Sequence, residues 1–566
     1  MHTITKFIKY GKSRQKTIKS LGYLHVLEKE YEDPISHFRK LAKEMTEEYN
    51  EKTKPINVKL DPLEKLDVNT DNSKNYGAIA LSKIYHELGL DRFFNGRQRF
   101  IKIKYNLNNA IKLLVFSRIL FPNSKKSTYE LKHKFFDNTD FTLPNIYDAL
   151  TRLYNYKTEL ITWLYEKVGD SYQRDNSIVF YDVTNYYFEI DSNDDDIYNE
   201  YGDLVEEGLR KKGVSKEHRP KPIVQMGLFM DKNHLPISYE LFSGNTPDTS
   251  TLRPSIKKAR LKYGLGKVVV VADKGLNSGD NIVYLKSGKN GYVFSKSVRN
   301  ATEEMKKYVL DKSGYMEISK DYKLKSKLEP REIYYTAVSG KKKKKNVDEK
   351  ILVVYSEKYK KKARHDREKT IKKAEDLVNN PSRYSQATTY GAAKYVDNLT
   401  YNTETGEIID TKLSFNFEKL KEDELLDGYY IIVTSEMDWS DERILDAYNE
   451  LWRIEETFKI TKSYLDARPV YVSTKEHIEA HFMICFIGLL IVRLLEKKTN
   501  AEIPIQSMLE SLKNSNYSLV EKNIHMLSYY DENLKIISEK MNIPFDNKYM
   551  TTGEIKKVLG ESKKVK

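Results

Sequence analysis

The run Lys267–Gly275, KVVVVADKG, constrains the fold of this chain more strongly than any other stretch. Its continuous apolar character is expected of a strand that is buried on both faces, which requires a sheet with helices packed on it. The run ends on Asp273. Carboxylates at the ends of buried central strands lie where open α/β sheets place their ligands. The run therefore predicts an α/β core with a polar site beside Asp273.

The segments before and after this strand indicate how the sheet is ordered. A strand rich in β-branched and aromatic residues is predicted at 178–190 and carries Asp182, an unusual residue for a strand interior. Strands at 223–231 and 235–244 follow, and a helix begins at about Pro247. Three strands in hairpin order, then a helix, a buried strand and a helix form the ribonuclease H-like succession. We therefore predict a ribonuclease H-like mixed-sheet catalytic core.

A chain of 566 residues is expected to divide into several domains. The N-terminal arm is polar, and it is predicted to contain one helix near 24–49 and a linker at 52–62. The region that follows the arm is predicted to be all-α, with either DNA binding or a purely structural role. From residue 428 the sequence GYYIIVTS returns to a core strand. The predicted divisions are an arm at 1–75, an all-α module at 76–170, the first part of the core at 171–298, a basic β-rich insertion at 299–425, the second part of the core at 426–500 and a C-terminal helical region at 501–566.

Charge and cysteine content narrow the class of protein. The formal net charge of +14 and the isoelectric point near 9.1 favour a polyanionic partner, for which double-stranded DNA is the first expectation. Cys485 is the only cysteine, which excludes an intrachain disulfide and a cysteine zinc cluster and favours a reducing cytoplasm. The longest apolar run, 482–492, predicts a buried helix rather than a membrane span. A nucleotide-binding Gly-x4-Gly-Lys-Ser/Thr motif is absent from the sequence, so ATP is not expected to drive the reaction.

The segment Asp446–Lys462, DAYNELWRIEETFKITK, is predicted to be one helix because apolar residues recur at three- and four-residue steps without Pro or Gly. Tyr448, Glu455 and Lys462 are seven residues apart, so they share one stripe of that helix. This row suits a metal-dependent reaction on a phosphate backbone. It also suits the polar edge of an ordinary amphipathic helix.

Asp182, Asp273 and Glu455 together form a candidate three-carboxylate set. Oxygen ligands of this kind suit Mg²⁺ or Mn²⁺, and two such ions would support an in-line phosphoryl displacement. The alternative is that Asp182 and Asp273 are strand-end turn residues. Glu450 and Glu456 are close enough in sequence to compete for the third position, but only Glu455 shares the stripe with Tyr448 and Lys462.

Several sequence blocks together resemble one family. They are YDVTNYYFE, KGVSKEHRPKPIVQMGLF, FSGNTPDTSTL, VVVADKGLNS, YSEKYKKKARHDREK and LWRIEETFKITKSYLDARPVYV, and they cover roughly 177–495. These blocks resemble bacterial insertion-sequence transposases of the Asp-Asp-Glu type, in the subgroup whose third block follows Tyr-x2-Arg-x3-Glu-x6-Lys. The Arg expected three residues after Tyr448 is Leu451 here, and Arg453 lies about 200° around the helix from Leu451, so it cannot simply replace that Arg.

The resemblance implies a function and a set of residues. It implies two divalent ions, Mg²⁺ or Mn²⁺, held by Asp182, Asp273 and Glu455, hydrolytic cleavage at the inverted repeats of the element, and strand transfer from a synaptic homodimer. Tyr448 and Lys462 would hold the phosphate near the cleaved end, and Arg453 and Lys459 of the same block are further candidate DNA contacts. We therefore expect a cut-and-paste DNA transposase in the bacterial cytoplasm, associated with the nucleoid. A decayed or domesticated DNA-binding protein and a non-transposing nuclease are the alternatives.

Other chemistry-bearing patterns rank lower. His477, Glu479 and His481 are expected to be the polar edge of a buried helix rather than a zinc site. The acidic run 194–196 is expected in a loop, and the lysine run 341–345 in a solvated loop with phosphate contact as a second possibility. Trp452 is expected in the core rather than as a base-stacking platform.

Overall fold

The structure is a computed structural model of the whole chain. It describes residues 2–10, 12–52, 63, 65, 67–68, 70–216, 220–337, 339–379, 391–397, 400–401, 408–410, 413–521 and 523–564. The chain forms two compact units, Met1–Asp71 and Asn72–Lys566. Each unit is described by itself.

The first unit contains a hairpin that the sequence analysis did not predict. Strand β1 (His2–Tyr10) pairs antiparallel with β2 (Lys12–Gly22), and helices α1 (Leu24–Leu27) and α2 (Pro34–Lys52) follow. The single helix predicted at 24–49 is therefore wrong. Pro34 occupies the first position of α2, where its missing N–H costs nothing, and Asp33 accepts a hydrogen bond from the Ser36 N–H at 3.1 Å. The predicted linker lies outside the described residues beyond Lys52.

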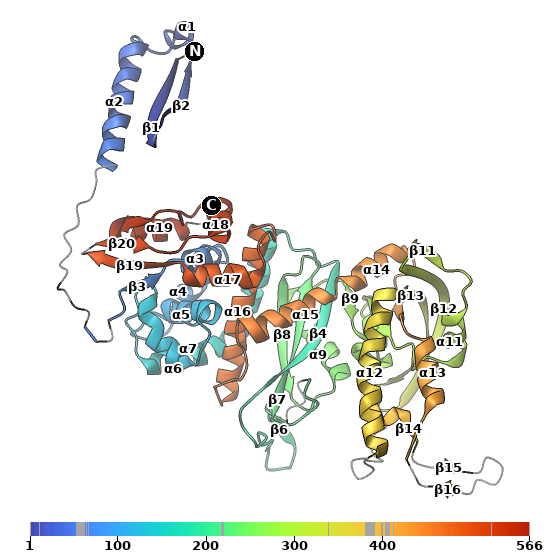
Figure 1. The fold of residues 1–566 in the computed structure, drawn as a ribbon. Coiled ribbons are helices and arrows are strands. Elements are labelled where there is room, and N and C mark those ends of the chain that lie inside the picture. Colours follow the sequence, from blue (N-terminus) through green and yellow to red (C-terminus); the bar gives the residue numbers. More distant parts are fainter. Residues whose placement is uncertain are drawn as a thin grey trace. The chain divides into compact units, whose positions relative to one another are not determined.

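The second unit begins with helices around one long apolar helix, α16 (Lys475–Lys498), as Figure 1 shows. Helices α3, α5 and α7 pack against α16. By length and composition α16 could cross a membrane, but its most apolar window is 94% buried inside the protein, so it is the core helix that the sequence predicts. The helices of this part are α3 (Ala78–Glu87), α4 (Leu90–Gln98), α5 (Leu107–Leu120), α6 (Lys125–Glu130), η1 (Leu131–Lys134), α7 (Leu143–Asn155) and α8 (Lys157–Tyr172).

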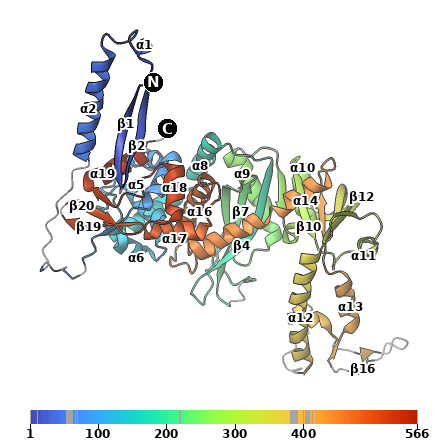
Figure 2. The ribbon, with the colours of Figure 1, turned by 45° about the horizontal axis from the view of Figure 1, so that its top comes forward.

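The centre of the second unit is a nine-stranded mixed sheet of order β11-β12-β13-β18-β10-β9-β4-β7-β8 (Figure 2). Strand β9 is parallel to β4 and to β10, and the other pairs are antiparallel. The valine run of β9 is buried along its length, as expected for a central strand. The strands predicted around Asp182 and Asp273 are confirmed: β4 (Ile178–Tyr187), β7 (Ile223–Asp231), β8 (Pro236–Ser243), β9 (Val269–Ala272) and β18 (Tyr429–Thr434). Strand β10 (Gly291–Lys296) was not predicted.

Helices connect and cover these strands. Helix α9 (Asp248–Tyr263) contacts β4, β7 and β8, and α10 (Gly279–Ser287) contacts β10 and β12. The 3₁₀ turn η2 (Lys274–Leu276) follows β9 and turns the chain away from the sheet directly after Asp273. The acidic loop between β4 and β7 contains the small hairpin β5 (Ile197–Tyr198) and β6 (Leu204–Glu206).

The strands predicted inside the insertion extend the core sheet. The long hairpin β12 (Tyr322–Thr336) and β13 (Lys342–Ser356) joins the sheet where β13 pairs with β18, and β11 (Met316–Ser319) pairs with β12. The lysine run predicted in a loop is wrong for Lys342–Lys345, which form the first residues of β13 opposite Ile333–Thr336. The remaining elements are α11 (Glu303–Leu310), α12 (Glu357–Asn379), η4 (Gly391–Tyr395), β14 (Val396–Asp397), β15 (Thr400–Tyr401), β16 (Ile408–Asp410), β17 (Ser414–Phe415) and α13 (Phe417–Leu425).

The C-terminal region is not purely helical. Strands β19 (Asn516–Glu521), β20 (Ile524–Leu527) and β21 (Tyr549–Thr551) form a sheet with β3 (Ser73–Asn75) from the start of the unit. Because β3 and β19 pair directly, the two ends of the second unit close on one another. The helices here are α17 (Ile505–Asn514), α18 (Glu532–Met541) and α19 (Thr552–Ser562).

The helix predicted at Asp446–Lys462 is broken in two places. It consists of α14 (Asp441–Asn449) and α15 (Trp452–Lys459), and it ends in a π-helical turn, η5 (Ile460–Tyr464). At the first break, the Leu451 N–H donates to the Tyr448 carbonyl at 3.0 Å and the Arg453 N–H to the Glu450 carbonyl at 3.0 Å, both three residues back. Helix α14 contacts β9, β10 and β18, whereas α15 contacts β4, so packing on two places of the sheet overrides the helical pattern.

Candidate active site

Asp182 lies in the middle of β4, partly buried between neighbouring strands. Its Oδ1 accepts a hydrogen bond from the Val183 N–H at 2.7 Å. The pKa of Asp182 is raised to about 6, first by burial and also by the charges of Asp273 and Glu455, whereas Lys216 and the Val183 N–H lower it. The three predicted carboxylates are therefore electrostatic neighbours in the folded chain, although each comes from a different element.

Asp273 lies at the carboxyl end of β9 and is exposed. Its Oδ1 accepts a hydrogen bond from the Ser295 Oγ of the parallel neighbour β10 at 2.8 Å. The pKa of Tyr448 is raised to about 12, first by burial and also by the charges of Asp273 and Glu455, whereas a hydrogen bond with Ser295 lowers it. Ser295 therefore connects the second carboxylate to the tyrosine of the predicted stripe. Sequence reasoning missed this serine, since nothing in GYVFSK marks it.

The three glutamates of the broken helix face different partners. Glu455 is exposed, and its negative charge raises the pKa of both Asp182 and Tyr448. Glu450 pairs with His234 at 2.7 Å, and Glu456 pairs with Arg493 at 3.0 Å. Glu450 and Glu456 thus each have a partner of their own, whereas the negative charge of Glu455 raises the pKa of Asp182.

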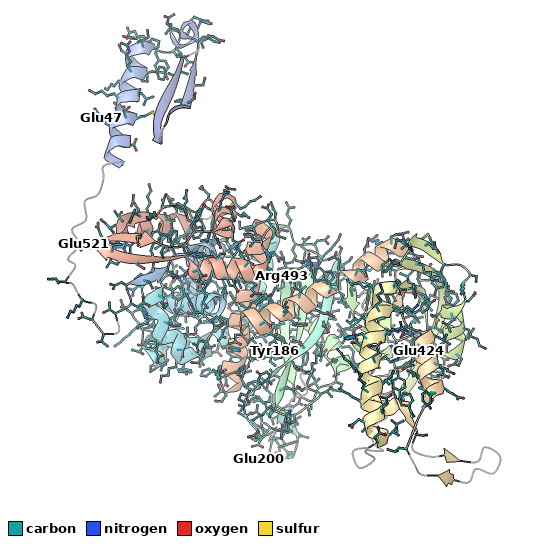
Figure 3. The ribbon with its side chains drawn as sticks, viewed as in Figure 1. Glu47, Tyr186, Glu200, Glu424, Arg493 and Glu521 are labelled. Atoms are coloured by element: carbon teal, nitrogen blue, oxygen red, sulfur yellow. The ribbon has the colours of Figure 1, made fainter. Side chains whose placement is uncertain are left out.

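Two buried side chains fix α15 and η5 in this orientation, and Figure 3 labels both. Arg493 of α16 donates to the Thr457 Oγ1 at 2.6 Å besides its pair with Glu456. Tyr186 of β4 exchanges a hydrogen bond of 2.7 Å with the Thr461 Oγ1. Sequence reasoning identified neither, although a charged residue that closes the apolar run 482–492 was a visible signal for Arg493.

The predicted DNA-contacting residues occupy different environments. The Lys462 Nζ lies 5.5 Å from the centre of the Tyr186 ring, and the Lys459 Nζ lies 6.0 Å from that of Tyr464. Arg453 pairs with Glu456 at 3.3 Å and stacks on Trp452 at 4.1 Å. The prediction that Trp452 lies in the core is wrong, because 50% of its surface is exposed.

The lower-ranked patterns are structural in the folded chain. His481 is buried, with its Nδ1 3.1 Å from the Lys125 Nζ and its Nε2 3.1 Å from the Ala467 carbonyl. Glu479 pairs with Lys157 at 2.8 Å. In the acidic loop, Asp194 pairs with Arg210 at 2.5 Å and Asp196 with Lys211 at 2.9 Å.

A cavity of about 500 Å³ opens beside the carboxylates. Asp273, Ser295 and Tyr448 form one side of it. The rest of the lining is mostly basic and aromatic, and it includes Lys274, Lys296, Arg299, Tyr322, Lys358, Tyr359, Lys362, Tyr429 and Tyr430. This cavity could not be predicted from the sequence, because its residues come from six separate segments.

The carboxylates can be tested for their fit to a metal. Carboxylate oxygens are the donors that hard divalent cations prefer, and the charges of Asp273 and Glu455 contribute less than burial to the raised pKa of Asp182. Within the part of the chain that the structure describes, no three His, Cys, Asp or Glu side chains are close enough to hold a single ion. The residue types therefore fit a divalent cation, whereas their spacing is wider than that of a formed metal centre.

Comparisons with known proteins place the chain in a family. The family model "Transposase DDE domain" matches residues 205–491, just over half of the chain, and the chain belongs to that family. The matched range contains Asp273 and Glu455 and begins after Asp182. No curated protein matches. Among solved structures, the chain is similar to the piggyBac transposase in its synaptic complex with hairpin DNA. The match has 6% sequence identity and a TM-score of 0.35, and it covers 86% of this chain and 85% of the other. These values carry no argument about the site.

Proposed function

We propose that this chain is a cut-and-paste DNA transposase whose reacting centre is built from Asp182, Asp273 and Glu455. It would cleave DNA at the inverted repeats of its element and join the freed 3′ ends to target DNA. The observation that carries the proposal is that β9, which Asp273 directly follows, and α15, which carries Glu455, both contact β4, the strand that carries Asp182.

The sheet supports this assignment. Its part β8-β7-β4-β9-β10 has three antiparallel strands followed by two parallel ones, and this order supports the ribonuclease H-like core that we propose. In this order Asp182 lies on the first strand of the core and Asp273 at the end of the adjacent parallel strand.

The residues have separable roles in the proposal. Mg²⁺ or Mn²⁺ ions, when bound, would activate the attacking water or 3′-hydroxyl and stabilise the leaving oxygen. Asp182, Asp273 and Glu455 would hold these ions. Tyr448, which faces Asp273 beside the cavity, and Lys462 would position the phosphate of the cleaved strand. We also infer that two copies act together on the two ends of the element, in the cytoplasm of a bacterium.

A cleavage assay tests the proposal. The protein is mixed with end-labelled DNA that carries the inverted repeats flanking its coding region, together with Mg²⁺ and a target plasmid. We expect cleavage at the repeat ends and joined products with wild-type protein, and neither with Asp182→Ala. Full cleavage by Asp182→Ala would refute the assignment of the site.

Two alternatives predict different products in the same assay. A decayed transposase would bind the repeats without nicking them in any divalent cation. The intact carboxylates argue against this alternative, and Leu451 in place of the Arg of the signature leaves it open. A non-transposing nuclease would cut but leave no joined 3′ ends.

A further inference from the structure

Helix α12 (Glu357–Asn379) carries a row of basic side chains that the proposed reaction does not use. At 100° per residue, seven exposed residues lie within about 60° of one line along the helix. We call this row the basic ridge, and it consists of Lys358, Lys361, Lys362, His365, Lys369, Lys372 and Lys373. Asp376 follows at its C-terminal end, and the other acidic residues of α12 lie on the flanks.

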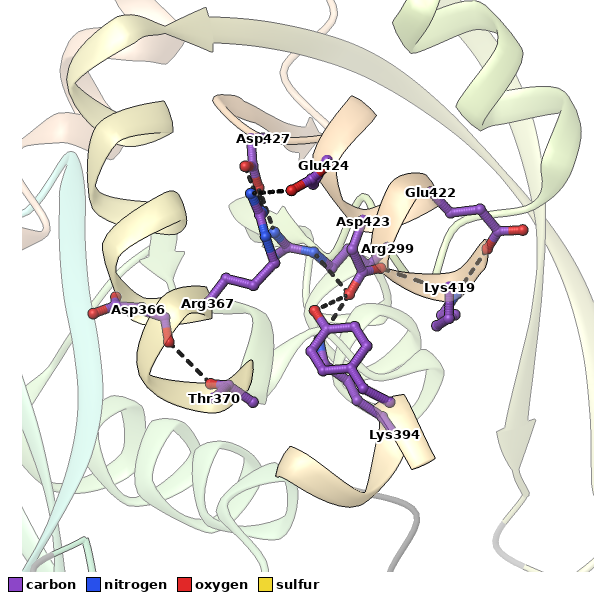
Figure 4. Close-up of polar contacts among 11 residues, drawn as sticks. Arg299, Asp366, Arg367, Thr370, Lys394, Lys419, Glu422, Asp423, Glu424 and Asp427 are labelled. Carbon is purple, nitrogen blue, oxygen red and sulfur yellow. Dashed lines mark hydrogen bonds and ion pairs between the residues drawn. The ribbon is translucent and has the colours of Figure 1, made fainter. Parts of the chain in front are cut away.

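The opposite side of α12 is packed, which fixes the direction of the ridge. Arg367 and Ala374 are buried and lie about 160–180° from the line of the ridge. Arg367 pairs with Asp427, which also pairs with Arg299 at 3.0 Å, and Figure 4 shows these contacts. Ala374 packs against Tyr395. The packed side therefore holds its own counterions, and the ridge points away from it.

The ridge lysines form no ion pairs of this kind. Among the described residues, no carboxylate lies within ion-pair distance of any of them, although Glu357 on the flank attracts Lys361, whereas Arg367 on the packed side is paired with Asp427. Six exposed lysines on one face repel one another unless an anion binds there. An extended polyanion complements this arrangement.

The position of the ridge identifies the polyanion. Lys358 and Lys362, at its N-terminal end, line the cavity that also holds Asp273 and Tyr448. From Lys358 to Lys373 the helix rises about 22 Å, which equals roughly six or seven base pairs of duplex at 3.4 Å each. A duplex that enters the candidate active site could therefore continue along the ridge.

We propose that the basic ridge binds the sugar–phosphate backbone of the DNA duplex leading into the candidate active site. The inference rests on the proposed function and adds a second contact surface to it. Lysines bind phosphate as point charges, and six of the seven ridge residues are lysines, so this contact depends mainly on the phosphate backbone and little on DNA sequence.

The salt dependence of DNA binding tests the inference. Lys369→Gln/Lys372→Gln/Lys373→Gln removes three ridge charges far from the cavity. As a matched control, Lys556→Gln/Lys557→Gln/Lys563→Gln removes three exposed charges from α19 and the residue directly after it. If the three ridge lysines contact phosphates, the slope of log K against log[salt] becomes less steep by about 2 to 3, and affinity at 0.1 M salt falls by about 100-fold or more. The control variant should keep the wild-type slope.

Photo-crosslinking gives the direction of the duplex. Cys485, the only cysteine, is buried, so Lys358→Cys and Lys372→Cys each introduce a single exposed thiol for an azidophenacyl crosslinker. We expect the Lys372→Cys crosslink about six base pairs farther from the cleavage position than the Lys358→Cys crosslink, from a rise of about 21 Å.

The outcomes separate the two proposals. Wild-type protein that binds and cuts DNA, together with a ridge variant whose slope equals that of the α19 control, would overturn the ridge assignment and leave the proposed function standing. Wild-type protein that binds no DNA would overturn both. Thermal unfolding followed by circular dichroism checks that the ridge variant keeps the wild-type fold, as its intact Arg367 and Ala374 contacts predict.

Discussion

Replacing each of three neighbouring glutamates by Gln tests which one belongs to the active site. The structure predicts that Glu455→Gln loses activity without losing stability, and that Glu456→Gln loses stability without losing activity. Glu450→Gln, whose partner His234 lies outside the carboxylate cluster, should change activity little. The loss of activity and the loss of stability are therefore expected at two different residues, Glu455 and Glu456, which are adjacent on one helix.

The size of the stability change follows from the contacts of Glu456. Its partner Arg493 has a side chain that is 2% exposed and keeps two other partners, Glu496 at 2.8 Å and the Thr457 Oγ1 at 2.6 Å. Gln retains an acceptor oxygen but loses the charge, and the Glu456 side chain is 31% exposed, so we expect a loss of about 1 kcal/mol in the free energy of unfolding. Glu455 is exposed and forms no ion pair with a described residue, so Glu455→Gln should cost less than about 0.5 kcal/mol.

The size of the activity change follows from the role proposed for Glu455. Stabilising charge at a reacting phosphate contributes several kcal/mol, and about 4 kcal/mol corresponds to roughly a thousandfold in rate. Single-turnover cleavage of labelled repeat DNA in Mg²⁺ measures this loss, and urea unfolding without divalent cations measures stability. If Glu456→Gln abolished cleavage while Glu455→Gln cut at the wild-type rate, the orientation of α15 described above would be refuted.

Two buried ionisable groups predict opposite pH dependences of stability. The pKa of Asp182 is raised from 3.8 to about 6, so the folded state binds more protons between these values, and the free energy of unfolding should fall by at most about 3 kcal/mol as pH rises through them. Asp182→Asn should remove this fall in urea titrations without divalent cations. Burial lowers the pKa of Lys125 from 10.5 to about 7, so between these two pH values the unfolded state binds more protons than the folded state. The free energy of unfolding should therefore rise from pH 7 to 10, by at most about 5 kcal/mol. Lys125→Met should flatten that rise and stabilise the protein at pH 7, and an unchanged pH profile would contradict the assignment of Lys125 as a buried amine.

The core strands could be predicted from the sequence because their information is local. The buried valine run of β9 and the β-branched segment of β4 specify strands within a few residues, and the carboxylates of Asp182 and Asp273 stand out against them. The choice of Glu455 over Glu450 and Glu456 used only the helical period.

The rest depends on contacts between distant segments. The addition of β13 to β18 joins residues about 80 positions apart, and the closure of β3 on β19 joins residues more than 400 apart. The apolar helix α16 shares its core with helices that precede it by more than 300 residues. No pattern within one segment encodes such pairings, so neither the nine-stranded sheet nor the cavity beside Asp273 could be read from the sequence.

The stripe of Tyr448, Glu455 and Lys462 was predicted from a spacing that the folded chain does not keep. The seven-residue spacing aligns side chains only on an uninterrupted helix, and this chain breaks the helix between Tyr448 and Glu455 and widens it to a π turn before Lys462. The charge of Glu455 nevertheless raises the pKa of Tyr448 and of Asp182. Its orientation must therefore come from tertiary anchors.

Arg493 at Glu456 and Thr457, and Tyr186 at Thr461, are the contacts that can supply this orientation. The first break also accounts for the departure from the family signature. Leu451 lies at the break and is buried, so it contributes apolar surface to the core where the signature has Arg. Arg453 is held by Glu456 and Trp452 and does not take over that position. If the ends of the element are gripped by a cation near the cleaved phosphate, that cation must come from another element, and the lysines that line the cavity are in place to supply it.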